Sequence, residues 1–222
     1  MPILTIASFK GGPGKTTLCQ IIAAQCATDG LSVAVIDADP TKAMSDWHKN
    51  TYEGAPFTCI AETSERTIAD LALGLDDKSD LVLIDTAGFG NLAGAVAMTV
   101  ADHILVPLTA GAADLNQAEE TIKQAKGLAT AARRKIEVRA IMNRLSKTNL
   151  TKHAERELRE AGIPTLEATI SHRTAFGEIS YSGEIPSKGS AAAEVTMLIN
   201  ELKTIGWIPR SSAASSHNEV EK

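Results

Sequence analysis

The sequence predicts a three-layer α/β fold, in which a mostly parallel, doubly wound sheet lies between two layers of helices. Short runs of Val, Ile and Leu alternate with helical stretches along the chain, and strands buried on both faces have this near-continuous apolar composition. Several of the runs end in glycine or in acidic residues, as strands do where an open α/β sheet binds its ligands. A length of 222 residues fits one such domain.

The expected strands follow the apolar runs, and the helices fit between them. We place strands at 3–9, 32–39, 80–88, 102–108 and 136–144, and helices at about 15–28, 41–49, 65–74, 114–131 and 150–161. The first helix should end at Asp29-Gly30, because glycine commonly terminates a helix. Beyond residue 163 we expect a short strand at 165–169, a helix that begins near Arg173 and a last helix at 191–203.

The end of the chain differs in composition from the rest. The stretch from about Arg210 is polar and rich in serine, which is typical of a disordered segment. We therefore expect one domain over residues 1–205 and a polar, disordered tail over residues 206–222.

Overall composition limits the classes of protein to consider. The formal net charge of −5 argues against a strongly basic nucleic-acid binder. No apolar stretch reaches the ~20 residues that span a bilayer, so we expect no membrane insertion. Cys19, Cys26 and Cys59 lack the paired spacing of a metal site, and we expect reduced thiols in a cytoplasmic protein.

A glycine-rich loop lies between the first expected strand and the first helix, in the sequence SFKGGPGKTT at residues 8–17. The general phosphate-binding pattern is G-x-x-x-x-G-K-[ST], and residues 14–16 fill its end. The first glycine of the pattern would fall on Phe9, so the ordinary motif is not matched. Two glycines follow Lys10 instead, and this second lysine has no place in the ordinary loop.

The loop still has the chemistry of a phosphate site. Glycines let backbone N–H groups approach phosphate oxygens, and the N-terminus of the following helix adds its positive dipole end. Lys15 would reach the outer phosphates of the ligand and the Thr16 hydroxyl would bind Mg²⁺, whereas Pro13 contributes no N–H. The predicted nucleotide-binding residues of the loop are Gly11, Gly12, Pro13, Gly14, Lys15, Thr16 and Thr17.

Acidic residues end two of the expected strands. Asp37 and Asp39 stand in the sequence DADP, and Asp85 ends the apolar run LVLID. Because ligands of open α/β sheets bind at the carboxyl ends of the strands, these carboxylates should face the phosphates. Asp85 would hold Mg²⁺ as the acid of a Walker B strand. Asp39 has a second interpretation, in which it only caps the helix that follows.

The segment K-G-G-x-G-K-T-T at residues 10–17 resembles the deviant Walker A signature of the ParA/MinD superfamily of ATPases. The resemblance implies a P-loop NTPase fold and a homodimer that forms on ATP and Mg²⁺. It also implies that Lys10 reaches across the dimer to the other subunit's nucleotide and places positive charge where phosphoryl transfer needs it. The catalytic residues are then predicted to be Lys10, Lys15 and Asp39.

Further roles follow from the same resemblance. Asp39 would orient the attacking water, and Asp37 would lie near the magnesium shell. Asn143, in the sequence AIMNR, would contact the adenine with Arg144 beside it, although an Asn at a strand end can also be only a turn former. The predicted metal ligands are Thr16, Asp37 and Asp85.

Within the superfamily, the chain most resembles the small ParA-type partition ATPases. Residues 170–186 resemble the pattern I-x-x-R-x-x-x-x-E-x-x-x-x-G-x-x-P, and the resemblance covers about residues 1–205. It implies a nucleoid-associated protein that binds DNA without sequence preference, through Lys and Arg contacts to phosphates, and that has a centromere-binding, ParB-like partner. The candidate DNA-binding residues are Arg173, Lys188, Lys203 and Arg210, with scattered solvated cations as the alternative.

Two other functions stay open at this point. One is an accessory ATPase of conjugative or T-DNA transfer, a class that shares the deviant loop; the other is an ATPase that positions a protein cargo. Nitrogenase iron proteins are excluded, because no cysteine lies in residues 85–130 to hold their cluster. The polar C-terminal sequence lacks an amphipathic pattern, so membrane targeting of the MinD type is not expected.

Overall fold

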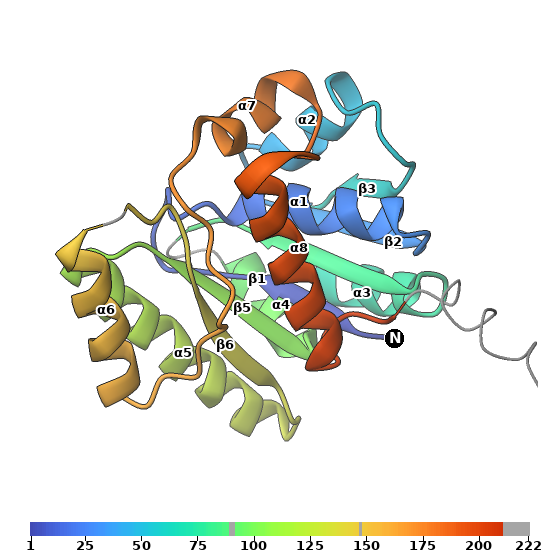
Figure 1. Ribbon diagram of the computed structural model, residues 1–222. Helices are drawn as coiled ribbons and strands as arrows, with labels where there is room; N and C mark the ends of the chain where they lie inside the picture. The colour runs from blue at the N-terminus through green and yellow to red at the C-terminus, as the bar shows by residue number, and fades with distance from the viewer. Residues whose placement is uncertain (89–91, 147, 211–222) are drawn as a thin grey trace, which may run out of the picture.

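The computed structural model describes residues 1–88, 92–146 and 148–210. These residues form a six-stranded sheet in the order β3-β2-β4-β1-β5-β6, in which all neighbouring strands are parallel (Figure 1). The three-layer α/β fold with a doubly wound parallel sheet is thereby confirmed. The strands are β1 (Ile3–Ile6), β2 (Val33–Ala38), β3 (Thr58–Ala61), β4 (Leu81–Thr86), β5 (His103–Leu108) and β6 (Glu137–Met142).

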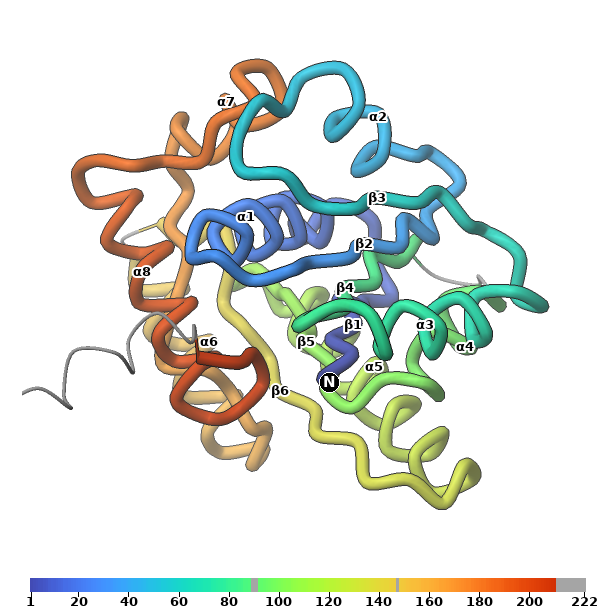
Figure 2. The backbone as a smooth tube through the Cα atoms, turned by 90° about the vertical axis from the view of Figure 1, so that its right-hand side faces the viewer, coloured from blue at the N-terminus to red at the C-terminus, as the bar shows by residue number. Residues whose placement is uncertain are grey.

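Helices cover both faces of the sheet. Helices α1, α7 and α8 pack on one face, around a large cluster of buried side chains, and α3, α4 and α5 cover the opposite face (Figure 2). The helices of the described residues are α1 (Lys15–Thr28), α2 (Ala43–Asn50), α3 (Ile68–Asp76), α4 (Leu92–Val100), α5 (Ala112–Ala132), α6 (Asn149–Glu160), α7 (Thr174–Ser182) and α8 (Gly189–Thr204).

The structure differs from the sequence-based prediction in three elements. Strand β3 and helix α4 lie in segments that the sequence left unassigned. The strand expected at 165–169 is wrong: this segment makes an isolated bridge between Thr165 and Ala140. The chain touches the edge of β6 there and next at Ile170, whose N–H donates to the Met142 carbonyl at 3.1 Å. Contacts so far apart do not form a continuous ladder.

Packed residues continue past the expected domain boundary at residue 205. Trp207 and Ile208 are buried, and the Trp207 ring stacks on His103 with ring centroids 4.9 Å apart. The indole N–H donates a hydrogen bond of 3.1 Å to Glu137. These contacts join the end of the described chain to the first residues of β5 and β6.

The tail predicted at residues 206–222 stays a prediction, because residues 211–222 lie outside the described part of the chain. In the part that is described, none of the helices combines the length and the apolar character needed to cross a bilayer.

Candidate functional site

The candidate site lies at the carboxyl ends of β1, β2 and β4. The strand register aligns Ile6 with Asp85, and Asp85 with Asp37. The phosphate loop begins directly after β1, in the middle of the sheet. Three neighbouring strands therefore bring the loop and two buried carboxylates together, at the edge where α/β sheets bind ligands.

Backbone conformation explains two of the loop glycines. Gly12 and Gly14 have φ angles of 98° and 96°, in the left-handed region that glycine adopts without strain. Gly14 is also packed too closely for a side chain, since a Cβ there would lie 2.3 Å from Asn143 Nδ2. Within the described residues, no side chain caps the N-terminus of α1, so its positive end faces the loop and suits an anion.

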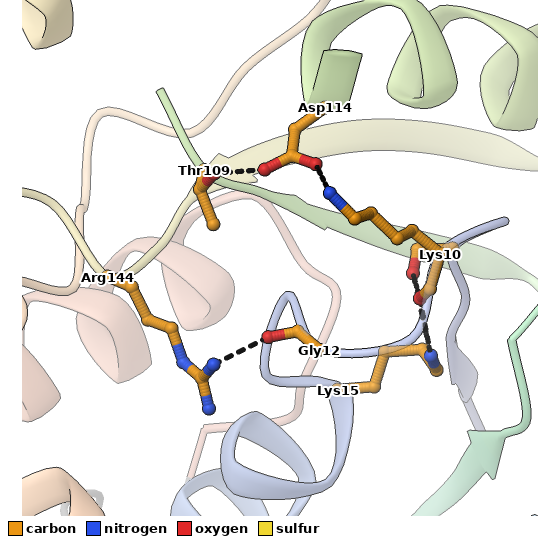
Figure 3. Close-up of polar contacts among 7 residues, drawn as sticks. Lys10, Gly12, Lys15, Thr109, Asp114 and Arg144 are labelled. Atoms are coloured by element: carbon orange, nitrogen blue, oxygen red, sulfur yellow. Dashed lines mark hydrogen bonds and ion pairs between the residues drawn. The ribbon is translucent and has the colours of Figure 1, made fainter. Parts of the chain in front are cut away.

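Lys15 lies inside the loop. The residue is 6% exposed, and its Nζ donates a hydrogen bond of 3.1 Å to the Lys10 carbonyl oxygen (Figure 3). Burial lowers the pKa of this ammonium group, while the nearby carboxylates of Asp85 and Asp39 raise it. A buried cation that points along the loop is suited to bind phosphate oxygens, because charge-assisted hydrogen bonds are stronger than those between neutral groups.

Asp85 supplies a carboxylate that lacks a hydrogen-bond partner. The residue is fully buried, and neither carboxylate oxygen accepts a hydrogen bond of ordinary geometry from another described residue. Burial raises the pKa of Asp85 to about 7, although the nearby Thr16 hydroxyl and Lys15 ammonium oppose the increase. An unpaired buried carboxylate is costly, and carboxylate and hydroxyl oxygens are ligands that Mg²⁺ prefers. Asp85 and Thr16 thus fit a magnesium ion, which when bound would neutralise phosphate charge.

The two acids after β2 are held by backbone amides. Asp37 accepts hydrogen bonds from the N–H of Ser45 at 2.8 Å and of Asp39 at 3.2 Å. The first of these ties Asp37 to the N-terminal turn of α2, so a structural role accompanies its predicted place near the metal. Asp39 accepts from the Thr41 N–H at 2.8 Å, whereas the N-cap position of α2 is Lys42. Asp39 is therefore not the N-cap of that helix.

Lys10 is held by its own chain. Its Nζ forms an ion pair of 2.6 Å with Asp114 in the first turn of α5, and Thr109 donates to the other carboxylate oxygen (Figure 3). Burial alone would raise the pKa of Asp114, but the hydrogen bonds from Lys10 and Thr109 lower it. The Lys10 side chain is 48% exposed, so the pair can open toward solvent. Sequence reasoning missed this pairing, because Lys10 and Asp114 are 104 positions apart along the chain.

Asn143 and Arg144 reach the phosphate loop from the end of β6. The Asn143 side-chain amide donates a hydrogen bond of 2.7 Å to the Pro13 carbonyl, and Arg144 Nη1 donates one of 2.7 Å to the Gly12 carbonyl. Arg144 has a φ of 54°, and its N–H donates to the Asn143 side-chain oxygen at 2.9 Å. Both side chains therefore brace the loop, and their contact with the adenine stays a prediction.

A cavity of about 330 Å³ lies beside α1, a volume within the range of small-molecule sites. Its walls come from α1, from Asn143 and Arg144, from residues 170–173 and from α7. Thr17, in the first turn of α1, is part of the wall. The cavity therefore begins where the phosphate-binding end of α1 begins.

Comparison with known proteins assigns the chain to a family. The sequence profile of the family described as VirC1 protein matches residues 1–204. The chain belongs to the VirC1 family. Together with the fold, this confirms the resemblance to the ParA/MinD superfamily of P-loop ATPases.

Relatives of this VirC1-family chain cover most of its length. Protein ParA of Rhizobium radiobacter is 24% identical over 204 residues, which are 90% of this chain and 91% of the relative. Protein virC1 of Rhizobium radiobacter is 26% identical over 190 residues, 82% of each chain. Maintenance of carboxysome distribution protein A of Gloeobacter kilaueensis is 30% identical over 185 residues, again 82% of each.

Solved structures share the fold of the VirC1-family chain. Cyanothece apo McdA has a TM-score of 0.78 at 16% identity, covering 91% of this chain and 99% of that one. The Pyrococcus furiosus cell division ATPase MinD has a TM-score of 0.72 at 19% identity, covering 92% and 99%. Similar folds were also solved as a complex of Cyanothece McdA(D38A) with ATP and as Pyrococcus horikoshii MinD with Mg-ADP.

The four candidate DNA-binding residues of the VirC1-family protein are not gathered in one place. Arg173 and Lys203 already form ion pairs with acidic residues of the same chain. Lys188 precedes α8 and Lys203 lies in its last turn, so roughly 20 Å separates them at 1.5 Å per residue. Arg210 is exposed after the end of α8. DNA contact by these residues stays a prediction.

Proposed function

We propose that this protein is a ParA-type ATPase that dimerises on ATP, binds DNA without sequence preference and partitions a plasmid or chromosome with a centromere-binding partner. The observation that carries the proposal is the site itself, which contains two lysines and a carboxylate that lacks a partner. Lys15 and Asp85 supply what one ATP·Mg²⁺ needs. Lys10 is not needed to bind that nucleotide. A second lysine at the edge of the loop can contact the nucleotide of another subunit when two such sites face each other.

ATP binding starts the proposed cycle. The phosphates would accept hydrogen bonds from the loop N–H groups and from Lys15, and Thr16 and Asp85 would hold Mg²⁺ with Asp37 close by. Lys10 leaves Asp114 and enters the other subunit's site. There it stabilises the charge of the transferring phosphoryl group, a role that in other phosphoryl-transfer enzymes is worth about 10³–10⁵ in rate. Asp39 orients the attacking water.

DNA binding depends on pairing in this proposal. One chain carries a formal net charge of −5, so its contacts to phosphates are weak. Joining two subunits makes the second set of contacts intramolecular and raises the overall affinity. The dimer is then nucleoid-associated in the cytoplasm, and a ParB-like partner stimulates hydrolysis and returns the protein to single chains.

A protein cargo is the second candidate. The relative named for carboxysome distribution is 30% identical, compared with 24% for the relative named ParA. Both candidates share the ATP cycle and differ in what the dimer moves. The same holds for a third candidate, an accessory ATPase of DNA transfer. Imaging the tagged protein in cells with and without the plasmid separates them, because a partition ATPase changes its distribution when its plasmid is lost.

Size-exclusion chromatography with light scattering tests the proposal, using wild type and Asp39→Ala with and without ATP and DNA. We expect single chains without nucleotide, and a persistent dimer for Asp39→Ala with ATP, because hydrolysis is blocked. Lys15→Ala should abolish nucleotide binding. Lys10→Ala should bind ATP as a single chain without productive pairing. Fast hydrolysis by single chains, unchanged by DNA or partner, would contradict the proposal.

A further inference from the structure

Gln20 is a buried polar residue that the site described above does not use. It lies in the second turn of α1, is 4% exposed and lines the cavity of about 330 Å³. Its side-chain amide makes no hydrogen bond to any other residue of the described chain. The amide atoms are not among the fully enclosed polar atoms without a partner, so they face the space of the cavity, where a ligand can reach them.

Four polar residues of the neighbouring cavity wall already make side-chain hydrogen bonds within the chain. Ser171 and Arg173 donate hydrogen bonds of 2.8 and 2.7 Å to Glu194. Asn143 and Arg144 donate to the carbonyls of the phosphate loop. These bonds hold the wall in place, while the guanidinium groups of Arg144 and Arg173 keep further N–H donors. The Gln20 amide offers a free donor and a free acceptor in a cavity of fixed shape.

Gln20 lies one turn along α1 from the phosphate site. Thr17 and Gln20 are three residues apart on α1 and both line the cavity, as expected for residues on one helix face. A ligand whose phosphates lie at the N-terminus of α1 can therefore place its other end against Gln20. Apolar side chains of Ile21, Ile170 and Phe176 form part of the wall, and such surfaces suit the flat face of a heterocyclic base.

We propose that Gln20 selects the base of the bound nucleotide, with its amide paired to adenine. The inference rests on the proposed function, because the loop must first hold the phosphates. A Gln side chain can pair with adenine through two hydrogen bonds, accepting from the N6 amino group and donating to N7. Guanine presents two acceptors, O6 and N7, at the same edge, so the Gln20 oxygen would face O6 with no proton between them.

Competition binding with ATP, GTP and inorganic triphosphate tests this on the full chain. Wild type should prefer ATP to GTP. Gln20→Met and Gln20→Leu remove the amide at similar volume and should lower that preference about 5- to 150-fold, with the affinity for triphosphate unchanged. Gln25→Met is the matched control, because Gln25 is on the same helix but its amide is bonded to Asp29 at 2.8 Å.

An ATP-to-GTP preference in the Gln20 variants equal to that of wild type would overturn the inference. The ratio compares two ligands on the same folded protein, so a loss of stability in one variant does not obscure it, and the second variant provides an independent measurement. Failure of the proposed function is recognised separately: wild type would then bind neither ATP nor triphosphate, which overturns both proposals.

Discussion

Lys10 has one partner in its own chain and would have another in the proposed dimer. In the single chain it forms an ion pair of 2.6 Å with Asp114. The Asp114 side chain is 13% exposed but that of Lys10 is 48% exposed, so water screens the pair from one side and we take its contribution as about 1 kcal/mol. Asp114 therefore competes only weakly with the nucleotide of a second subunit, and Lys10 can leave it when that nucleotide is present.

Removing the Asp114 charge should favour the dimer. We expect Asp114→Asn to lower the dissociation constant of the ATP dimer by up to about fivefold, measured by sedimentation or light scattering at several protein concentrations. The effect should shrink at high salt. Glu119→Gln, which removes one exposed charge from the same helix, is the control. Weaker dimerisation of Asp114→Asn would show that Asp114 supports the dimer instead.

Asp85 is a second residue whose role can be tested alone. Asp85→Asn removes a buried carboxylate without a partner, so the nucleotide-free variant should be at least as stable as wild type. Mg²⁺ should add less to the stabilisation by ADP, because one of its predicted ligands is gone. Thermal unfolding with ADP, with and without Mg²⁺, measures both effects. Asp77→Asn, at an exposed position after α3, is the control, and an undiminished magnesium effect in Asp85→Asn would rule out this ligand.

At the scale of elements, helix α8 holds the segment between β6 and α7. The Glu194 carboxylate on α8 accepts hydrogen bonds from the Ser171 N–H at 2.9 Å and from Arg173 at 2.7 Å. Both residues line the cavity beside α1, whereas Glu194 does not. A helix near the end of the chain therefore positions a wall of the candidate nucleotide site.

This contact should make stability depend on pH. Burial alone would raise the pKa of Glu194, but the hydrogen bonds from Arg173 and Ser171 lower it below its ordinary value of 4.5. An acid with a lowered pKa stabilises the fold above its unfolded pKa, and this contribution is lost as the pH falls through the folded pKa. The free energy of unfolding of wild type, measured with urea, should therefore fall more steeply below about pH 5 than that of Glu194→Gln.

The control for this prediction is Glu178→Gln, an exposed position on α7. It should follow the wild-type dependence on pH. Equal acid dependence of wild type and Glu194→Gln would mean that the contact with Arg173 contributes nothing to stability.

At the scale of the whole molecule, Trp207 closes the fold against the starts of β5 and β6. Trp207 is fully buried, so Trp207→Ala should lower the free energy of unfolding by about 3–5 kcal/mol. Tyr181→Ala, at a residue that is 88% exposed, should change it little. Urea unfolding measures both. If Trp207→Ala left the free energy of unfolding unchanged, the result would support a domain that ends at residue 205, as expected from the sequence.

Local features of the sequence were sufficient for the loop and the acids. Glycines in the left-handed region, such as Gly12, and a lysine at the start of a helix have chemistry that depends on their immediate neighbours. Asp37 and Asp85 could be paired in advance because parallel strands end at the same edge. Strand β3 was missed because it lies at the edge of the sheet and its residues are exposed or half-buried, so it lacks the apolar run of the central strands.

The sequence by itself determined the α/β class, the phosphate loop and the unusual second lysine, since each depends on residues that are close along the chain. Only the tertiary structure decided what those residues meet. Lys10 and Asp114 are 104 positions apart, and Arg144 and Gly12 are 132 positions apart. Such contacts follow from the order in which the strands pair and from which helix covers which face of the sheet. The periodicity of the sequence does not determine either of these.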